Sequence, residues 1–300
     1  MEIKERIQAL KQKRNAVILA HYYVADEVQE IADYTGDSYA LAKKAAGLPC
    51  DVIVFCGVRF MGESAKLLSP EKTVYLPAPK ADCPMAHMAS VAEIERVRRE
   101  VDDLAVVAYV NSTAELKAHS DVCVTSSNAV RIVKALPQKN IYFIPDDNLG
   151  RFVKEQVPEK NFISCGGFCP RHNAVTKEDV LRAKAEHPSA LVLVHPECRK
   201  EVVELADFVG STAEILDYAH KSGEKQFIIG TEMGIFYRLT QDNPDKEFFL
   251  MSDRLLCPNM KLITLQSVLD ALEGKVPEVP LPDRADEARA PLQEMLRLGK

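Results

Sequence analysis

AVILAH, residues 16–21, recurs twice farther along the chain, as LAVVAY (residues 104–109) and ALVLVH (residues 190–195). The final residues of these apolar runs, His21, Tyr109 and His195, are separated by 88 and then by 86 residues. Small hydroxyl-bearing residues recur with the same two steps, at Ser38, Ser126 and Thr212. Landmarks that repeat in register indicate a chain built from similar structural units.

Each copy has the same predicted order of helices and strands. A charged amphipathic helix comes first (residues 3–13, 91–101 and 177–187), and the repeated apolar strand follows it. A second helix is predicted over residues 27–35 in the first copy and 201–209 in the third, and the hydroxyl residues then open another helix. Two further strands complete the copy, with a helix between them. Short continuous apolar runs that alternate with helices indicate buried parallel strands covered by helices.

The sequence therefore predicts an α/β fold of three similar small domains (αβα, each with a parallel sheet), related by pseudo-threefold symmetry around a central active site. The predicted boundaries are 1–85, 86–172 and 173–258. In the remaining segment, 259–300, residues 260–274 resemble the opening helix of a copy. Residues 275–291 are rich in proline and charge and are expected to be extended. A final helix is predicted over 291–299, and the whole segment is expected to pack back on the first domain.

Composition limits the class of protein. Of 300 residues, 47% are hydrophobic and 27% are charged, which is typical of a globular chain with a substantial core. The formal charge of −6 argues against a dedicated nucleic-acid-binding protein. No apolar run approaches the roughly 18 residues that a membrane helix needs, and no signal-like apolar region opens the chain. We expect a cytoplasmic protein whose eight cysteines are free thiols.

Three of the cysteines follow the repeat. Cys83, Cys169 and Cys257 each precede a proline just after the last strand of a copy, with steps of 86 and 88 residues. Cys165 has no counterpart and is expected only to pack. Because ligands of open α/β sheets bind at the carboxyl ends of the strands, the three cysteines are expected to converge on the pseudo-threefold axis.

Three converging thiolates suit a soft metal centre. A structural zinc ion prefers a closed set of four ligands, whereas a [4Fe–4S] cluster normally takes four cysteines. With three cysteines, one iron would keep an open position and could act as a Lewis acid. A junction of three domains favours the cluster over a structural zinc ion, which stays the alternative.

Polar residues also recur at the predicted strand ends. The first strand of each copy ends in a polar group: His21 with Tyr23, Tyr109 with Asn111, and His195 with Glu197. These residues fit ordinary loop hydrogen bonds, but His, Tyr and Glu are also the usual proton-transfer groups. The hydroxyl residues fit helix N-caps, and they equally fit anion binding at helix N-termini. A neighbouring residue can cap while the hydroxyl binds the anion.

Beyond these patterns, the motifs LAHYY, YTGDS, GVRFMGE, ADCPMA, YVNSTAE, TSSNAV, GFCPRH, HPEC, VGST, GTEMG and CPNMK span nearly the whole chain. Through them the chain resembles the quinolinate synthase A family, iron–sulfur enzymes of NAD biosynthesis. The resemblance implies condensation of iminosuccinate with dihydroxyacetone phosphate to give quinolinate, phosphate and water. It also implies an active site between three similar domains, and a [4Fe–4S] cluster held by Cys83, Cys169 and Cys257.

The same resemblance implies roles for individual residues. His21 matches a substrate-contacting histidine, Tyr23 a catalytic tyrosine and Glu197 a catalytic glutamate. His172 matches a histidine near the site whose role is less defined. Tyr109 and Asn111 match a substrate-binding loop, and His195 matches a substrate-binding histidine. Tyr109 and His195 are therefore also catalytic candidates. The anion-binding hydroxyls of the family are matched by Ser38, Ser126 and Thr212.

One departure from the family pattern is Tyr22, where many members carry asparagine. The implied metabolic partner is the enzyme that supplies iminosuccinate, an aspartate oxidase or dehydrogenase. Two other functions stay open: a redox or oxygen sensor that uses the same cluster, and a zinc-stabilised protein that binds small anions.

Overall fold

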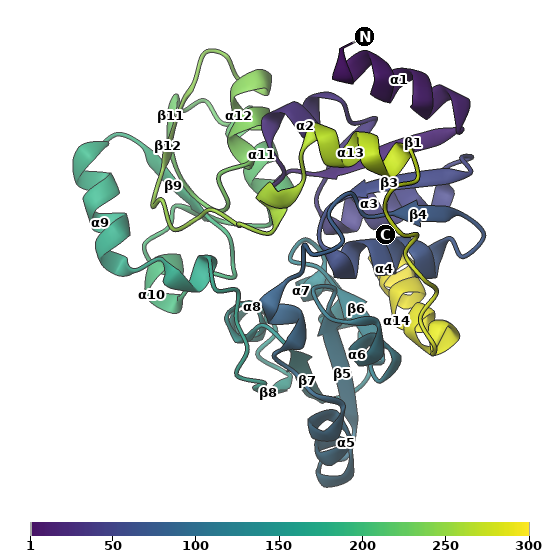
Figure 1. The fold of residues 1–300 in the computed structure, drawn as a ribbon. Coiled ribbons are helices and arrows are strands. Elements are labelled where there is room, and N and C mark those ends of the chain that lie inside the picture. The colour runs from purple at the N-terminus through teal and green to yellow at the C-terminus, as the bar shows by residue number, and fades with distance from the viewer. Residues whose placement is uncertain (1, 300) are drawn as a thin grey trace.

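The computed structural model describes residues 2–299, which form three lobes, each built on one four-stranded parallel sheet (Figure 1). The strand orders are β2-β1-β3-β4, β6-β5-β7-β8 and β10-β9-β11-β12. The strands are β1 (Ala16–His21), β2 (Tyr34–Gly36), β3 (Val52–Cys56), β4 (Thr73–Tyr75), β5 (Leu104–Tyr109), β6 (Val122–Val124), β7 (Asn140–Ile144), β8 (Asn161–Ile163), β9 (Leu191–Val194), β10 (Phe208–Val209), β11 (Gln226–Gly230) and β12 (Glu247–Leu250). The prediction of an α/β fold with three similar units is confirmed.

The helices also recur in the same order in the three units, and a short 3-10 turn follows the last strand of each. The helices are α1 (Ile3–Lys13), α2 (Asp26–Glu30), α3 (Ser38–Gly47), α4 (Arg59–Leu68), α5 (Val91–Glu100), α6 (Ala114–Ala118), α7 (Ala129–Ala135), α8 (Asp147–Gln156), α9 (Lys177–Glu186), α10 (Lys200–Val203), α11 (Thr212–Lys221) and α12 (Ile235–Asp242). The 3-10 turns are Pro84–His87, His172–Ala174 and Met260–Leu262. The predicted domain boundaries remain a proposal.

A repeated aspartate explains one error of the sequence prediction. In each unit its side chain accepts a hydrogen bond from a backbone N–H of the first strand. The pairs are Asp33 with Ile18 (2.8 Å), Asp121 with Val106 (2.7 Å) and Asp207 with Val192 (2.8 Å). These bonds align the following residues with the first strand, where they form β2, β6 and β10. The helices predicted over 27–35 and 201–209 therefore end early, at Glu30 and Val203, and each sheet gains a fourth strand.

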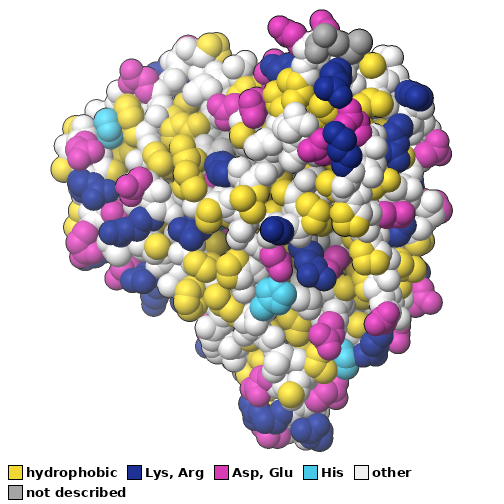
Figure 2. All heavy atoms as spheres, in the orientation of Figure 1, with side chains coloured by type: hydrophobic (Ala, Val, Ile, Leu, Met, Phe, Trp, Pro, Cys, Tyr) yellow, Lys and Arg dark blue, Asp and Glu magenta, His cyan; other side chains and the backbone are white. Residues whose placement is uncertain are grey.

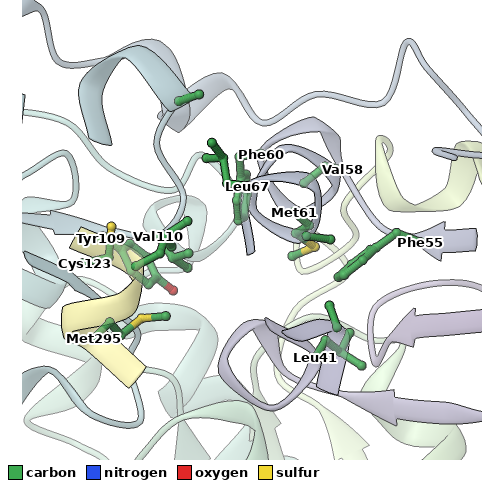
Figure 3. Packing of buried hydrophobic residues seen from close by; sticks show 14 of the residues in the cluster. Leu41, Phe55, Val58, Phe60, Met61, Leu67, Tyr109, Val110, Cys123 and Met295 are labelled. Atoms are coloured by element: carbon green, nitrogen blue, oxygen red, sulfur yellow. The ribbon is translucent and has the colours of Figure 1, made fainter. Parts of the chain in front are cut away.

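The C-terminal segment connects two of the units. Helix α13 (Leu265–Leu272) packs on α1, and α14 (Ala285–Leu298) packs on α4 of the first unit and on α6 and β6 of the second. Figure 3 shows Met295 of α14 beside Cys123 and Tyr109 of the second unit. Residues 285–290, predicted as extended, are helical, and Pro291 lies inside α14. Burial of Leu292 and Met295 offsets the cost of a proline in a helix.

The apolar cores reflect this connection. One continuous cluster of buried residues runs through the first unit, the second unit and the C-terminal helices, whereas the sheet of the third unit has a separate cluster on each face. On the face shown in Figure 2, acidic and basic side chains are interspersed over the three lobes. Within residues 2–299, none of the helices combines the length and apolar character needed to cross a membrane.

The position of Leu292 makes the role of α14 testable. Its side chain is fully buried, so Leu292→Ala is expected to lower the free energy of unfolding by about 2–5 kcal/mol, through lost burial and a residual cavity. Leu281, which is 45% exposed, provides the control, and its alanine variant should change that free energy by less than about 0.5 kcal/mol. Urea unfolding measures both. Equal effects of the two substitutions would contradict the packing role of α14.

Candidate active site

One cavity lies where the three units meet, and its walls contain the carboxyl ends of the strands and the loops that follow them. All thirteen residues singled out in the sequence line this cavity: His21, Tyr23, Ser38, Cys83, Tyr109, Asn111, Ser126, Cys169, His172, His195, Glu197, Thr212 and Cys257. Cys165 is half-buried and is not part of the cavity wall. The repeat therefore brings together residues that are up to 236 positions apart in the sequence.

Two buried histidines have their tautomers set by the backbone. The N–H of Tyr23 donates to His21 Nδ1 (3.2 Å), and the N–H of Glu197 donates to His195 Nδ1 (3.3 Å). Burial lowers the pKa of His21 to about 3 and that of His195 to about 4, so both rings are neutral at neutral pH. Since Nδ1 accepts in each ring, the proton lies on Nε2. His195 uses it to donate to Ser126 Oγ over 3.1 Å.

A chain of hydrogen bonds joins Tyr23 to Glu197. The Tyr23 hydroxyl lies 2.8 Å from Thr231 Oγ1, which lies 3.0 Å from His172 Nε2. His172 Nδ1 lies 2.7 Å from Glu197 Oε2. One proton arrangement that satisfies all three contacts has Tyr23 donate to Thr231, Thr231 donate to His172, and His172 donate to the carboxylate. Tyr23 also contacts Thr212 Oγ1 over 2.7 Å.

Glu197 is a buried anion. Burial alone would raise its pKa, but His195 and His172 outweigh that effect and hold the pKa of Glu197 below its usual range. A hydrogen bond from Tyr109 also favours the carboxylate. Burial, reinforced by the charge of Glu197, raises the pKa of both Tyr23 and Tyr109 well above the usual value. The cavity thus combines an ionised carboxylate with two tyrosines that keep their protons.

The three cysteines present thiols to the same cavity. Burial raises the pKa of all three, to about 12 for Cys83, and the nearby thiols Cys257 and Cys169 interact electrostatically with Cys83. Within the described part of the chain, one set of metal-ligating atoms lies within 4.8 Å of one another: those of Cys169, His172 and Glu197. These thiol, imidazole and carboxylate groups are donors that could hold a metal ion.

Helix N-termini form another part of the wall. Asp37 accepts the N–H of Ala40 and caps α3, while Ser38, the first residue of that helix, lines the cavity. Ser211 caps α11 through a capping box with Glu214, while Thr212 lines the cavity. In the first and third units, therefore, one residue caps the helix and its neighbour faces the cavity. The second unit differs, because the residue before α7, Asn128, makes no side-chain cap there.

Two polar groups of the wall are not accounted for by protein contacts. Asn111 Oδ1 is buried without a hydrogen-bond partner, so a ligand group is expected to satisfy it. Arg171 is exposed, and it is the one Lys or Arg among the described residues that line the cavity.

Thr231 and Glu232, which directly follow β11 and are almost fully buried, were not predicted from the sequence as site residues. The signal in the sequence that could have identified them is their position in GTEMG, directly after an apolar strand. Thr231 bridges Tyr23 and His172, which lie 208 and 59 residues before it in the sequence. Contacts of this kind are tertiary, and local spacing does not reveal them.

The lowered pKa of His21 has a measurable consequence. Below about pH 6.5 the unfolded chain binds a proton at His21 that the folded chain excludes until about pH 3, so stability falls as the pH drops through this window. Between about pH 8 and pH 5, His21 should account for about 2 kcal/mol of lost stability. Urea unfolding of the metal-free protein measures this effect. Between the same two pH values, the free energy of unfolding of His21→Gln should fall by about 2 kcal/mol less than that of wild type. Identical pH dependence would contradict the buried neutral histidine.

Comparison with known proteins identifies the family of this chain. Residues 5–297 match the family model described as quinolinate synthetase A protein. The quinolinate synthase of Caldicellulosiruptor bescii is 54% identical over 298 residues, covering 99% of this chain and 98% of that protein. The quinolinate synthases of Thermodesulfovibrio yellowstonii and Geobacter metallireducens are 52% and 51% identical, and each alignment covers at least 97% of both chains. The chain therefore belongs to the quinolinate synthetase A family.

Proposed function

We propose that this protein is a quinolinate synthase, a condensing and dehydrating transferase of NAD biosynthesis. It joins iminosuccinate to dihydroxyacetone phosphate and releases quinolinate, inorganic phosphate and two molecules of water. The observation that carries the proposal is the single cavity lined by matching residues of all three units, in a chain that belongs to this family. An aspartate oxidase or dehydrogenase is the expected source of iminosuccinate.

Cys83, Cys169 and Cys257 would hold a [4Fe–4S] cluster. One zinc ion with bonds of about 2.3 Å to sulfur brings its thiolates to about 3.8 Å from one another. The three cysteines do not form a set within 4.8 Å among the described residues, which favours a larger centre. Their thiol donors are the usual ligands of iron–sulfur clusters. When bound, the cluster would supply a Lewis acid, because three cysteines leave one iron open for a substrate carboxylate, nitrogen or hydroxyl.

The anionic groups of the substrates have partners in the wall. Ser38 and Thr212 combine a hydroxyl with the N-terminus of a ten-residue helix, where free N–H groups and the helix dipole favour phosphate or carboxylate. Ser126 and the unsatisfied Asn111 side chain add neutral hydrogen-bonding groups. Arg171 supplies positive charge at an exposed position, which suits attraction of anions into the cavity.

The hydrogen bonds of the site support a proposal for the proton transfers. Glu197 is ionised and buried, so it is suited to remove the proton that converts the triose phosphate to its enediol. Tyr23 keeps its proton and can donate to a leaving hydroxyl, while Thr231 and His172 connect it to Glu197. The Nε2–H of His21 is a neutral donor that can orient a substrate carbonyl or hydroxyl without transferring a proton, and the Nε2–H of His195 can do the same when a substrate oxygen replaces Ser126 as its acceptor.

Replacement of Tyr23 tests the acid role. Tyr23→Phe keeps the ring but removes the hydroxyl, so it is expected to lower kcat by about 100-fold or more. Quinolinate formation by the reconstituted protein measures this, with iron content determined on the same sample. A variant with full iron content and wild-type kcat would contradict the role of Tyr23.

The metal ligands are tested by four alanine variants. Cys83→Ala, Cys169→Ala and Cys257→Ala are each expected to abolish the cluster and the activity, and Cys165→Ala is the matched control that should keep both. Anaerobic reconstitution followed by iron, sulfide and zinc analysis measures the outcome. A colourless wild-type protein with one zinc ion would support the anion-binding alternative. A fully clustered protein that makes no quinolinate would support the sensor.

A further inference from the structure

The backbone N–H of each of the three cysteines donates to a carboxylate. Cys83 N–H donates to Asp82 Oδ1 (2.7 Å), Cys169 N–H to Asp146 Oδ2 (3.0 Å), and Cys257 N–H to Glu232 Oε1 (2.9 Å). We propose that Asp82, Asp146 and Glu232 are positioning residues that fix the three cysteines and keep their backbone N–H groups away from the cluster. The inference rests on the cluster of the proposed function.

Two of these carboxylates occupy equivalent places in the fold. Asp146 and Glu232 are 86 residues apart, each just beyond the third strand of its unit, and both are at most 1% exposed. Their remaining oxygens accept the N–H of Leu149 (2.8 Å) and of Gly234 (2.7 Å). Each carboxylate therefore connects the end of one strand to the segment around the cysteine that follows the neighbouring strand. We call the segments around Cys83, Cys169 and Cys257 the cysteine corners.

In the first unit, the N–H of the cysteine is accepted by a residue at a different position. The equivalent position, 88 residues before Asp146, is occupied by Val58, which has no acceptor. Asp82, directly before Cys83, accepts the N–H instead, and its other oxygen lies 2.9 Å from His87 Nε2. The position of the acceptor residue differs between the units, but in all three a carboxylate accepts the N–H of the cysteine. This hydrogen bond is therefore the shared feature of the three cysteine corners.

Two physical effects follow for a bound cluster. A cysteine corner held at its own N–H has less freedom, so the thiol is already placed when iron binds. In iron–sulfur proteins, hydrogen bonds to the sulfurs and the net charge nearby set the reduction potential. With these N–H groups engaged by carboxylates, a cluster receives fewer such bonds and stays oxidised more readily, which suits a Lewis acid rather than an electron carrier.

The chain offers a matched control. Asp147 accepts the N–H of Cys165 over 2.9 Å in the same segment as Cys169, but Cys165 does not line the cavity. Asp147→Ala removes a similar carboxylate contact without freeing the N–H of a proposed ligand.

The test compares Asp82→Ala, Asp146→Ala and Glu232→Ala with Asp147→Ala after anaerobic reconstitution. Each of the first three should raise the equilibrium constant for cluster reduction by about tenfold or more, which for a one-electron couple corresponds to 59 mV. Each should also speed iron loss to a chelator by a similar factor. Asp147→Ala should change neither. The measurements are a redox titration followed by electron paramagnetic resonance, and the absorbance decay after chelator addition.

Asp146 and Glu232 are buried, so their alanine variants risk misfolding. Asp82 is half-exposed, which makes Asp82→Ala the variant least dependent on folding. Asp146→Asn and Glu232→Gln keep an acceptor oxygen and should restore chelator resistance to within about threefold of wild type. Wild-type potentials and rates in Asp82→Ala, or equal changes in Asp147→Ala, would overturn the inference. A wild-type protein that takes up no cluster would instead overturn the proposed function.

Discussion

The close contact between the first and third units is the constraint on which the cavity depends. Gly234, after β11, lies against the loop after β1 so tightly that a Cβ atom at this position would be 2.7 Å from Tyr23 Cα and from the carbonyl oxygen of Tyr22. Gln29 donates to the Gly234 carbonyl (2.9 Å), and Lys261 donates to the Tyr23 carbonyl (2.6 Å). No other residue than glycine allows this approach, and the approach brings the Tyr23 hydroxyl within hydrogen-bonding distance of Thr231 and Thr212.

The proposed binding of anionic substrates would have to rely on few positively charged groups. The protein carries a net charge of −6, and Glu197 is itself an ionised group inside the cavity. Attraction for phosphate and carboxylate groups must then come from the N-termini of α3 and α11, from neutral donors and from Arg171 at the exposed side. Neutral histidines fit this arrangement, because a donor without charge can orient an oxygen atom and leave the proposed proton transfers to Tyr23 and Glu197.

Much of this could be predicted from the sequence because the repeat converts distance along the chain into equivalent positions in space. The carboxyl ends of β1, β5 and β9, and the cysteine corners, were predicted in this way. The prediction failed where tertiary contacts decide the structure. Strands as short as Phe208–Val209 have no periodicity of their own and are aligned by Asp207. Helix α14 extends through Pro291 because its apolar face is buried between two units. Thr231, Asp146 and Glu232 act through partners more than 20 residues away in the sequence.

The proposed function requires that three cysteines, one from each unit, hold a four-iron cluster with one iron left open to substrate. Mössbauer spectroscopy of the protein reconstituted with iron-57 tests it most directly, before and after addition of quinolinate, which carries two carboxylates and a ring nitrogen. One iron of the four should differ from the others, and its spectrum alone should change on addition of quinolinate. Four irons that remain equivalent and unchanged with quinolinate would contradict it.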